Sequence, residues 1–88
     1  MQPADEVVRA QVKALLAERL KTSSEALTET STLEHLGLDS LLLTETVTAV
    51  EDHYDLALDV IPLAEVLSPT LPLSVLLEEL TKMVMDAR

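Results

Sequence analysis

The sequence contains no cysteine, tryptophan or phenylalanine, and Tyr54 is its only aromatic residue. Without cysteine the chain can form no disulfide framework, no thiolate metal site and no cysteine nucleophile. Apolar residues still make up 48% of the 88 positions, so the core must consist of leucine, valine, alanine and methionine. This composition favours packed helices over a sheet, and a chain of this length can build only one core.

Lysine and arginine are absent between Thr22 and Thr81, although the formal net charge of the whole chain is −10. The same interval holds twelve of the acidic residues, so its surface must be strongly negative at neutral pH. Nucleic acid and anionic membranes are therefore unsuitable partners, whereas proteins with basic patches are expected ones. The alternative is that the acidity serves only solubility.

No apolar run approaches the length needed to span a membrane, and the N-terminal segment has no cationic start followed by an apolar stretch. We therefore expect a cytoplasmic protein with no membrane partner.

Apolar residues recur at helical spacing in three stretches, which predicts helices over about 4–20, 40–54 and 71–85. A short third helix is expected over about 62–67, with a proline in its first turn, where a missing N–H does no harm. We expect Thr70 to cap the last helix.

Residues 21–38 are rich in serine and threonine, which predicts a long loop anchored to the core by scattered leucines, with room for a short helical turn. The alternation over 55–60 resembles a strand, but a single strand would have no partner, so a loop is favoured there. Together these elements predict an all-α fold. It is a small antiparallel four-helix bundle with a long first loop and a short third helix, in a single domain over 1–88.

The segment Gly37-Leu38-Asp39-Ser40-Leu41 lies where the long loop meets the second predicted helix. Asp39 can cap that helix, which places Ser40 at its first position with an exposed hydroxyl. A helix N-terminus presents unused N–H groups and the positive end of the helix dipole, so a phosphodiester on Ser40 would be stabilised there.

This motif, together with the helix pattern of nearly the whole chain, resembles the acyl carrier protein family. The resemblance implies that Ser40 carries a 4′-phosphopantetheine arm, which a phosphopantetheinyl transferase takes from coenzyme A in the presence of Mg²⁺. It also implies that Asp39 assists this transfer or holds Mg²⁺ near Ser40. The chain would then catalyse nothing itself and would carry acyl groups as thioesters between partner enzymes.

Two features favour specialised metabolism. The turn Ser68-Pro69-Thr70-Leu71 is similar to that of polyketide and nonribosomal peptide carriers, and the apolar Leu42 directly after the motif is similar to polyketide carriers. Asp39 in place of a second glycine is more similar to an acyl than to a peptidyl carrier. The resemblance thus implies specialised metabolism such as antibiotic biosynthesis, with a ketosynthase or an acyltransferase as partners. A fatty-acid or peptidyl carrier is the alternative, and an unmodified acidic helical adaptor that binds a basic partner is an alternative of another class.

Five residues are candidates for contacts with basic partner surfaces. They are Leu41, Leu42, Glu45, Glu51 and Asp52. We expect a monomer whose docking to partner enzymes is transient. The start at Met1 and the lack of linker-like ends favour a free-standing protein over a domain excised from a synthase.

Catalysis by the chain itself is disfavoured. His35, Asp39 and Ser40 could be taken for a hydrolytic triad, but the motif lacks the glycine after serine that a nucleophile elbow needs. His35, His53 and the nearby acids show no ligand spacing typical of a metal site.

Overall fold

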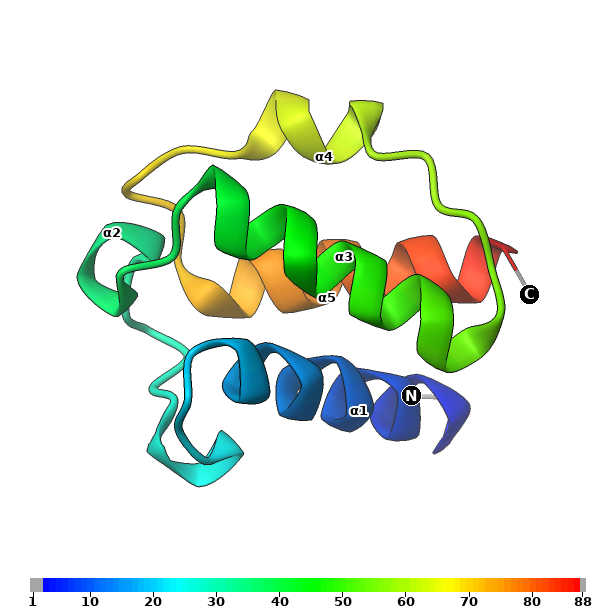
Figure 1. The fold of residues 1–88 in the computed structure, drawn as a ribbon, viewed down its shortest axis with the longest axis horizontal. Coiled ribbons are helices and arrows are strands. Elements are labelled where there is room, and N and C mark those ends of the chain that lie inside the picture. Colours follow the sequence, from blue (N-terminus) through cyan, green and yellow to red (C-terminus); the bar gives the residue numbers. More distant parts are fainter. Residues whose placement is uncertain (1–2, 88) are drawn as a thin grey trace.

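The computed structural model describes residues 3–87, and within them the chain forms helices and connecting loops without a β-strand. The three longer helices are α1 (Pro3–Arg19), α3 (Ser40–Tyr54) and α5 (Leu73–Ala87), and α4 (Ile61–Val66) is short. Helices that follow one another among these four run in opposite directions (Figure 1). The predicted fold class, a small helical bundle with a short third helix, is confirmed.

The long first loop contains two short helical segments, η1 (Ser24–Ala26) and α2 (Leu33–Leu36). The alternating stretch 55–60 is a loop. Figure 1 shows that α2 lies at the end of the bundle where α3 and α5 begin. The long loop therefore reaches the start of α3 through a short helix.

The core is aliphatic and includes buried side chains from α1, α2, α3, α4 and α5. α5 contributes most, because Leu73, Leu76, Leu77, Leu80 and Val84 are completely buried along one face. α1 packs against both α3 and α5. Burial of a leucine or valine side chain contributes about 1.5–3 kcal/mol, so these stripes supply most of the driving force for folding.

Backbone hydrogen bonds connect the loop before α3 to the loop before α5. The amides of Leu33 and Glu34 at the start of α2 donate to the carbonyls of Leu71 (3.0 Å) and Pro69 (2.9 Å). In return, the amides of Leu73 and Ser74 at the start of α5 donate to carbonyls of the long loop, at 2.8 and 2.9 Å. The two loops thus supply acceptors for N–H groups that the starts of α2 and α5 would otherwise leave unpaired.

These bonds correct the expectation that Thr70 caps the last helix. α5 begins at Leu73, two residues later than predicted, and Pro72 lies directly before it. Carbonyls of the long loop occupy the first amides of α5, and the Thr70 hydroxyl lies 3.3 Å from that of Ser68 instead. A distant segment of chain thus replaces the side-chain cap that the local sequence favours.

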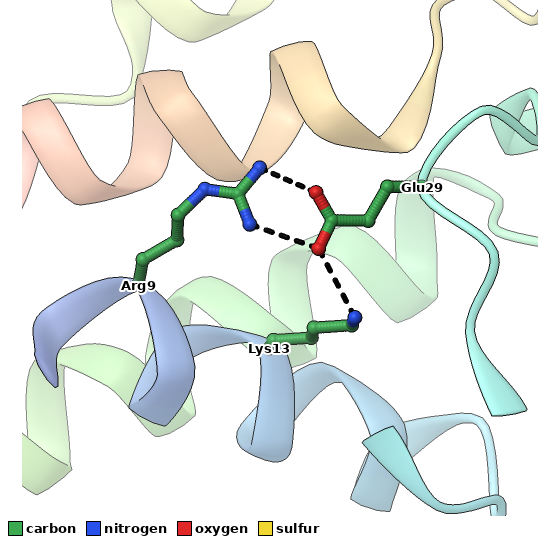
Figure 2. A network of polar contacts seen from close by, with 3 residues as sticks. All are labelled: Arg9, Lys13 and Glu29. Carbon is green, nitrogen blue, oxygen red and sulfur yellow. Dashed lines mark hydrogen bonds and ion pairs between the residues drawn. The ribbon is translucent and has the colours of Figure 1, made fainter. Parts of the chain in front are cut away.

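An ion cluster holds the middle of the long loop against α1 (Figure 2). The guanidinium of Arg9 donates to both carboxylate oxygens of Glu29, at 2.6 and 2.9 Å, and Lys13 Nζ donates to Oε2 at 3.1 Å. The Arg9 hydrogen bonds, and then that of Lys13, lower the pKa of Glu29 from 4.5 to about 2. Because the Glu29 carbonyl also accepts the Ser74 amide, this residue connects the loop to two helices.

Candidate functional site: the start of helix α3

The turn between α2 and α3 consists of three residues, each with a separate structural task. Gly37 ends α2 with a positive φ of 73°, which an L side chain rarely adopts. Leu38 donates its amide to the Leu33 carbonyl at 2.9 Å and is buried in the core. Asp39 has extended backbone angles, and its Oδ1 accepts the Leu42 amide at 2.8 Å, so it caps α3.

Ser40 is the first residue of α3, and its side chain is exposed. The Asp39 side chain and carbonyl occupy the amides of Leu42 and Leu43. The amides of Ser40 and Leu41 are therefore the first-turn donors with no intrahelical acceptor. They lie at the positive end of the helix dipole, which stabilises an anion attached to the serine oxygen.

Two grooves meet at Ser40. The first, which we call the loop groove, has a volume of about 480 Å³ and runs between Ser40, Glu34 of α2 and the turn at Ser68 and Pro69. The second, the helix groove, has a volume of about 410 Å³ and follows α3 from Ser40 to Glu51. Ser40, Leu43 and Leu67 line both grooves, so the two grooves adjoin there.

The helix groove has one partly polar and one aliphatic wall. Thr44, Thr48 and Glu51 line it from α3, and residues including Leu63 and Ala64 of α4 line it from the other side. The three polar residues follow Ser40 at helical spacing, so the groove extends along α3 for about 16 Å at a rise of 1.5 Å per residue. An amphipathic chain attached at Ser40 would find both apolar surface and hydrogen-bond acceptors there.

The predicted docking residues separate into three environments. Leu41 is 68% exposed beside Ser40, whereas Leu42 is half-buried and packs against the core. Glu45 and Asp52 are exposed and line a common hollow with Arg19. Glu51 lies apart from them in the helix groove.

Glu51 also has a structural role that the sequence did not reveal. Its Oε2 accepts the Leu58 amide at 2.8 Å, and its carbonyl accepts the amides of Asp55 and Leu56. These bonds hold the segment after α3 in place, and that segment forms part of the wall of the helix groove.

Two further groups of residues at or near the site were missed by sequence reasoning. The first group, Arg9, Lys13 and Glu29, fixes the loop that leads to Ser40, and the spacing of Arg9 and Lys13 on one face of α1 was the only available signal. The second comprises Thr44 and Thr48 of the groove wall, together with Arg19. Among the residues that the structure describes, no group of three or more His, Asp or Glu side chains could hold a metal ion.

The family known as the phosphopantetheine attachment site matches residues 10–71, well over half of the chain. The chain belongs to this family. The matched region includes the second half of α1, the long loop, the capped turn, α3, α4 and the turn before α5. Members are carriers of a covalent 4′-phosphopantetheine group and are substrates of phosphopantetheinyl transferases, without catalytic activity of their own.

Comparison with curated proteins and with solved structures gives no significant match. In the part of the chain that the structure describes, no helix is long and apolar enough to cross a membrane.

The residues around Ser40 fit the phosphopantetheine group. The hydroxyl is exposed, the helix end beside it favours the charge of a phosphodiester, and both grooves open at the point of attachment.

Proposed function

We propose that Ser40 is the residue that carries the phosphopantetheine arm. The observation that supports this most directly is its place as the exposed first residue of the capped helix α3, inside the region that matches the family. No other described serine combines exposure with the first position of a helix longer than three residues.

The modification breaks one bond on the protein and one on the donor. The Ser40 hydroxyl gives up its proton, and its oxygen forms a bond to the β-phosphorus of coenzyme A. The pyrophosphate linkage breaks, and the nucleotide half of the coenzyme leaves. The free amides of the first turn of α3 stabilise the new phosphodiester charge, and we propose that the Asp39 carboxylate assists the transferase and its Mg²⁺.

The arm ends in a thiol that holds an acyl group as a thioester, and partner enzymes must find and release the carrier in turn. We propose that Leu41 and Leu42 provide an apolar contact beside the arm and that Glu45 and Asp52 attract basic partner surfaces. Exposed charges of this kind raise the association rate more than the affinity, which suits repeated short encounters.

A polyketide or hybrid pathway is the setting we propose. The turn Ser68-Pro69-Thr70-Leu71 supports it by resemblance, and in the structure its Pro69 carbonyl accepts the Glu34 amide and so helps to fix the approach to Ser40. The threonines on the wall of the helix groove also suit a partly oxidised acyl chain better than a fully saturated one.

Intact mass spectrometry tests the attachment. The unmodified protein is incubated with coenzyme A, Mg²⁺ and a broad-specificity phosphopantetheinyl transferase until a control carrier is fully converted. We expect one phosphopantetheine increment in the natural protein and in Ser68→Ala, which removes another exposed hydroxyl of the loop groove, and none in Ser40→Ala. The absence of an increment in the natural protein would refute the carrier function and favour the acidic adaptor.

A condensation assay tests the pathway. The malonyl-loaded carrier is offered to a polyketide ketosynthase and to a fatty-acid ketosynthase, and the product thioesters on the carrier are quantified by mass spectrometry. Faster condensation with the polyketide enzyme is expected, and a preference for the fatty-acid enzyme would contradict the proposed setting.

A further inference from the structure

Glu51 brings a carboxylate to the far end of the helix groove. The residues of α3 that line this groove run from Ser40 to Glu51, which is about three helical turns. Most of the remaining lining is aliphatic and includes Leu58, Leu63 and Leu67. A chain that starts at Ser40 and follows the groove therefore passes apolar surface before it reaches a charged group.

The two carboxylate oxygens of Glu51 have different surroundings. Oε2 accepts the Leu58 amide at 2.8 Å, and the side chain is half-buried. Within the part of the chain that the structure describes, Oε1 accepts no hydrogen bond and Glu51 forms no ion pair. A charged oxygen that is taken out of water needs a donor in place of the water. An occupant of the groove can therefore cover Oε1 without loss only if it donates a hydrogen bond.

The bond to Leu58 also keeps this carboxylate in the groove. An exposed glutamate such as Glu45 can turn into solvent when apolar material approaches. Glu51 cannot do so without releasing the Leu58 amide, and Leu58 is itself part of the groove wall. Escape of the carboxylate would therefore disturb the wall that an apolar chain needs.

We propose that Glu51 is a specificity-determining residue of the carrier, and that it selects acyl chains with a hydrogen-bond donor, such as a hydroxyl, where the chain reaches Oε1. A saturated chain at the same place removes water from the carboxylate and returns no donor, so it is held less firmly. This inference rests on the proposed carrier function and names the class of chain that the helix groove accepts.

Thermal unfolding of the loaded carrier tests the inference. A broad-specificity phosphopantetheinyl transferase loads Ser40 from coenzyme A analogues in which a stable amide replaces the thioester. The analogues come in pairs, one with a saturated chain and one with the same chain ending in a hydroxyl, over a series of lengths. For at least one length, we expect the hydroxyl-ended chain to raise Tm by about 5 °C more than its saturated partner.

Variants of Glu51 show whether this difference in Tm depends on the carboxylate. Glu51→Gln keeps an acceptor for Leu58 but offers only neutral hydrogen bonds, so the difference should fall to about half. Glu51→Met removes every polar atom of the side chain, so the difference should disappear. Glu45→Gln is the matched control, because it removes the same charge from an exposed position of α3 outside the helix groove, and it should leave the difference unchanged.

Hydrogen exchange of the Leu58 amide, followed by NMR, reports on the groove wall separately. We expect the natural protein to protect this amide most when it carries the hydroxyl-ended chain. Equal Tm values for the two chains at every length would overturn the proposal. A preference that persists in Glu51→Met, or that falls equally in Glu45→Gln, would also overturn it.

Failure of the carrier function would look different from failure of this inference. If Ser40 is not modified, intact mass shows no increment with any analogue. If only the inference is wrong, every analogue is loaded completely and the Tm values do not follow the predicted order.

Discussion

Glu29→Gln removes the carboxylate charge that holds the long loop against α1, while it keeps the size of the side chain. In the natural protein Arg9 and Lys13 donate three hydrogen bonds to this carboxylate (Figure 2). Glutamine offers one neutral oxygen in place of two charged ones, so it cannot satisfy both cations. We expect the variant to fold with the loop less firmly attached to α1.

The size of the effect follows from the pKa of Glu29. A decrease from the ordinary value of 4.5 to about 2 corresponds to roughly 3 kcal/mol of stability by linkage. The three side chains are between a fifth and a third exposed, and solvent screening of such pairs reduces the expected loss to about 1–2 kcal/mol. For a domain of this size that loss lowers Tm by roughly 5–15 °C.

The pH dependence has a definite sign. The pKa of Glu29 is lowered in the folded state, so its contribution is fully present above about 4.5 and is lost as the pH falls towards about 2. The gap in the free energy of unfolding between the natural protein and Glu29→Gln should therefore be largest near pH 7 and close steadily below pH 4.5. The other carboxylates titrate in both proteins, so their effect cancels in the difference between the two free energies of unfolding.

Urea unfolding followed by circular dichroism at several pH values measures this gap. Glu25→Gln is the matched control, because it removes the same charge from an exposed position of the same loop, in η1. The reasoning is refuted if the two variants are equally stable at pH 7, or if the gap for Glu29→Gln is the same at pH 2.5 as at pH 7.

Two further predictions concern the ends of α3. Asp39→Ala should cost about 1 kcal/mol by removing the cap on the Leu42 amide, measured by thermal unfolding. Asp39→Asn should keep that stability yet slow modification of Ser40 if the carboxylate assists the transfer, and equal modification rates would remove that role. Glu51→Ala should cost about 1 kcal/mol and expose the Leu58 amide to hydrogen exchange, whereas Glu51→Gln, which keeps an acceptor, should preserve its protection. Unchanged exchange in both variants would show that the Glu51 contact does not hold the segment.

The sequence predicted those parts of the fold that depend on local periodicity. The helical spacing of Leu73, Leu76, Leu77, Leu80 and Val84 alone predicts one shared face, and all five are buried, because residues three and four apart share one face of a helix in any context. On α1 the helical spacing of apolar residues also includes Leu15 and Leu20, yet these two side chains are only partly buried, whereas Ala17 is buried. Periodicity identifies a face, but the neighbouring helices decide how much of it is covered.

The start of a helix could be predicted where the local sequence marks it. Asp39 caps α3 and accepts the amide of Leu42, three positions later, so the start of that helix could be inferred from the motif itself. The start of α5 depends on carbonyls of Glu29 and Ser31, more than forty positions earlier in the chain. No local pattern around Thr70 reveals such acceptors.

By itself, the sequence determined the aliphatic helical bundle, the exposed serine at a capped helix start and the acidity of the surface around it, because each follows from neighbouring residues and composition. The tertiary structure alone decided which charges meet. It placed Glu29 against Arg9 and Lys13, and it brought Arg19 to the hollow that Glu45 and Asp52 line. Those contacts join segments far apart in the chain, and they form only when burial of the core has fixed how the helices pack.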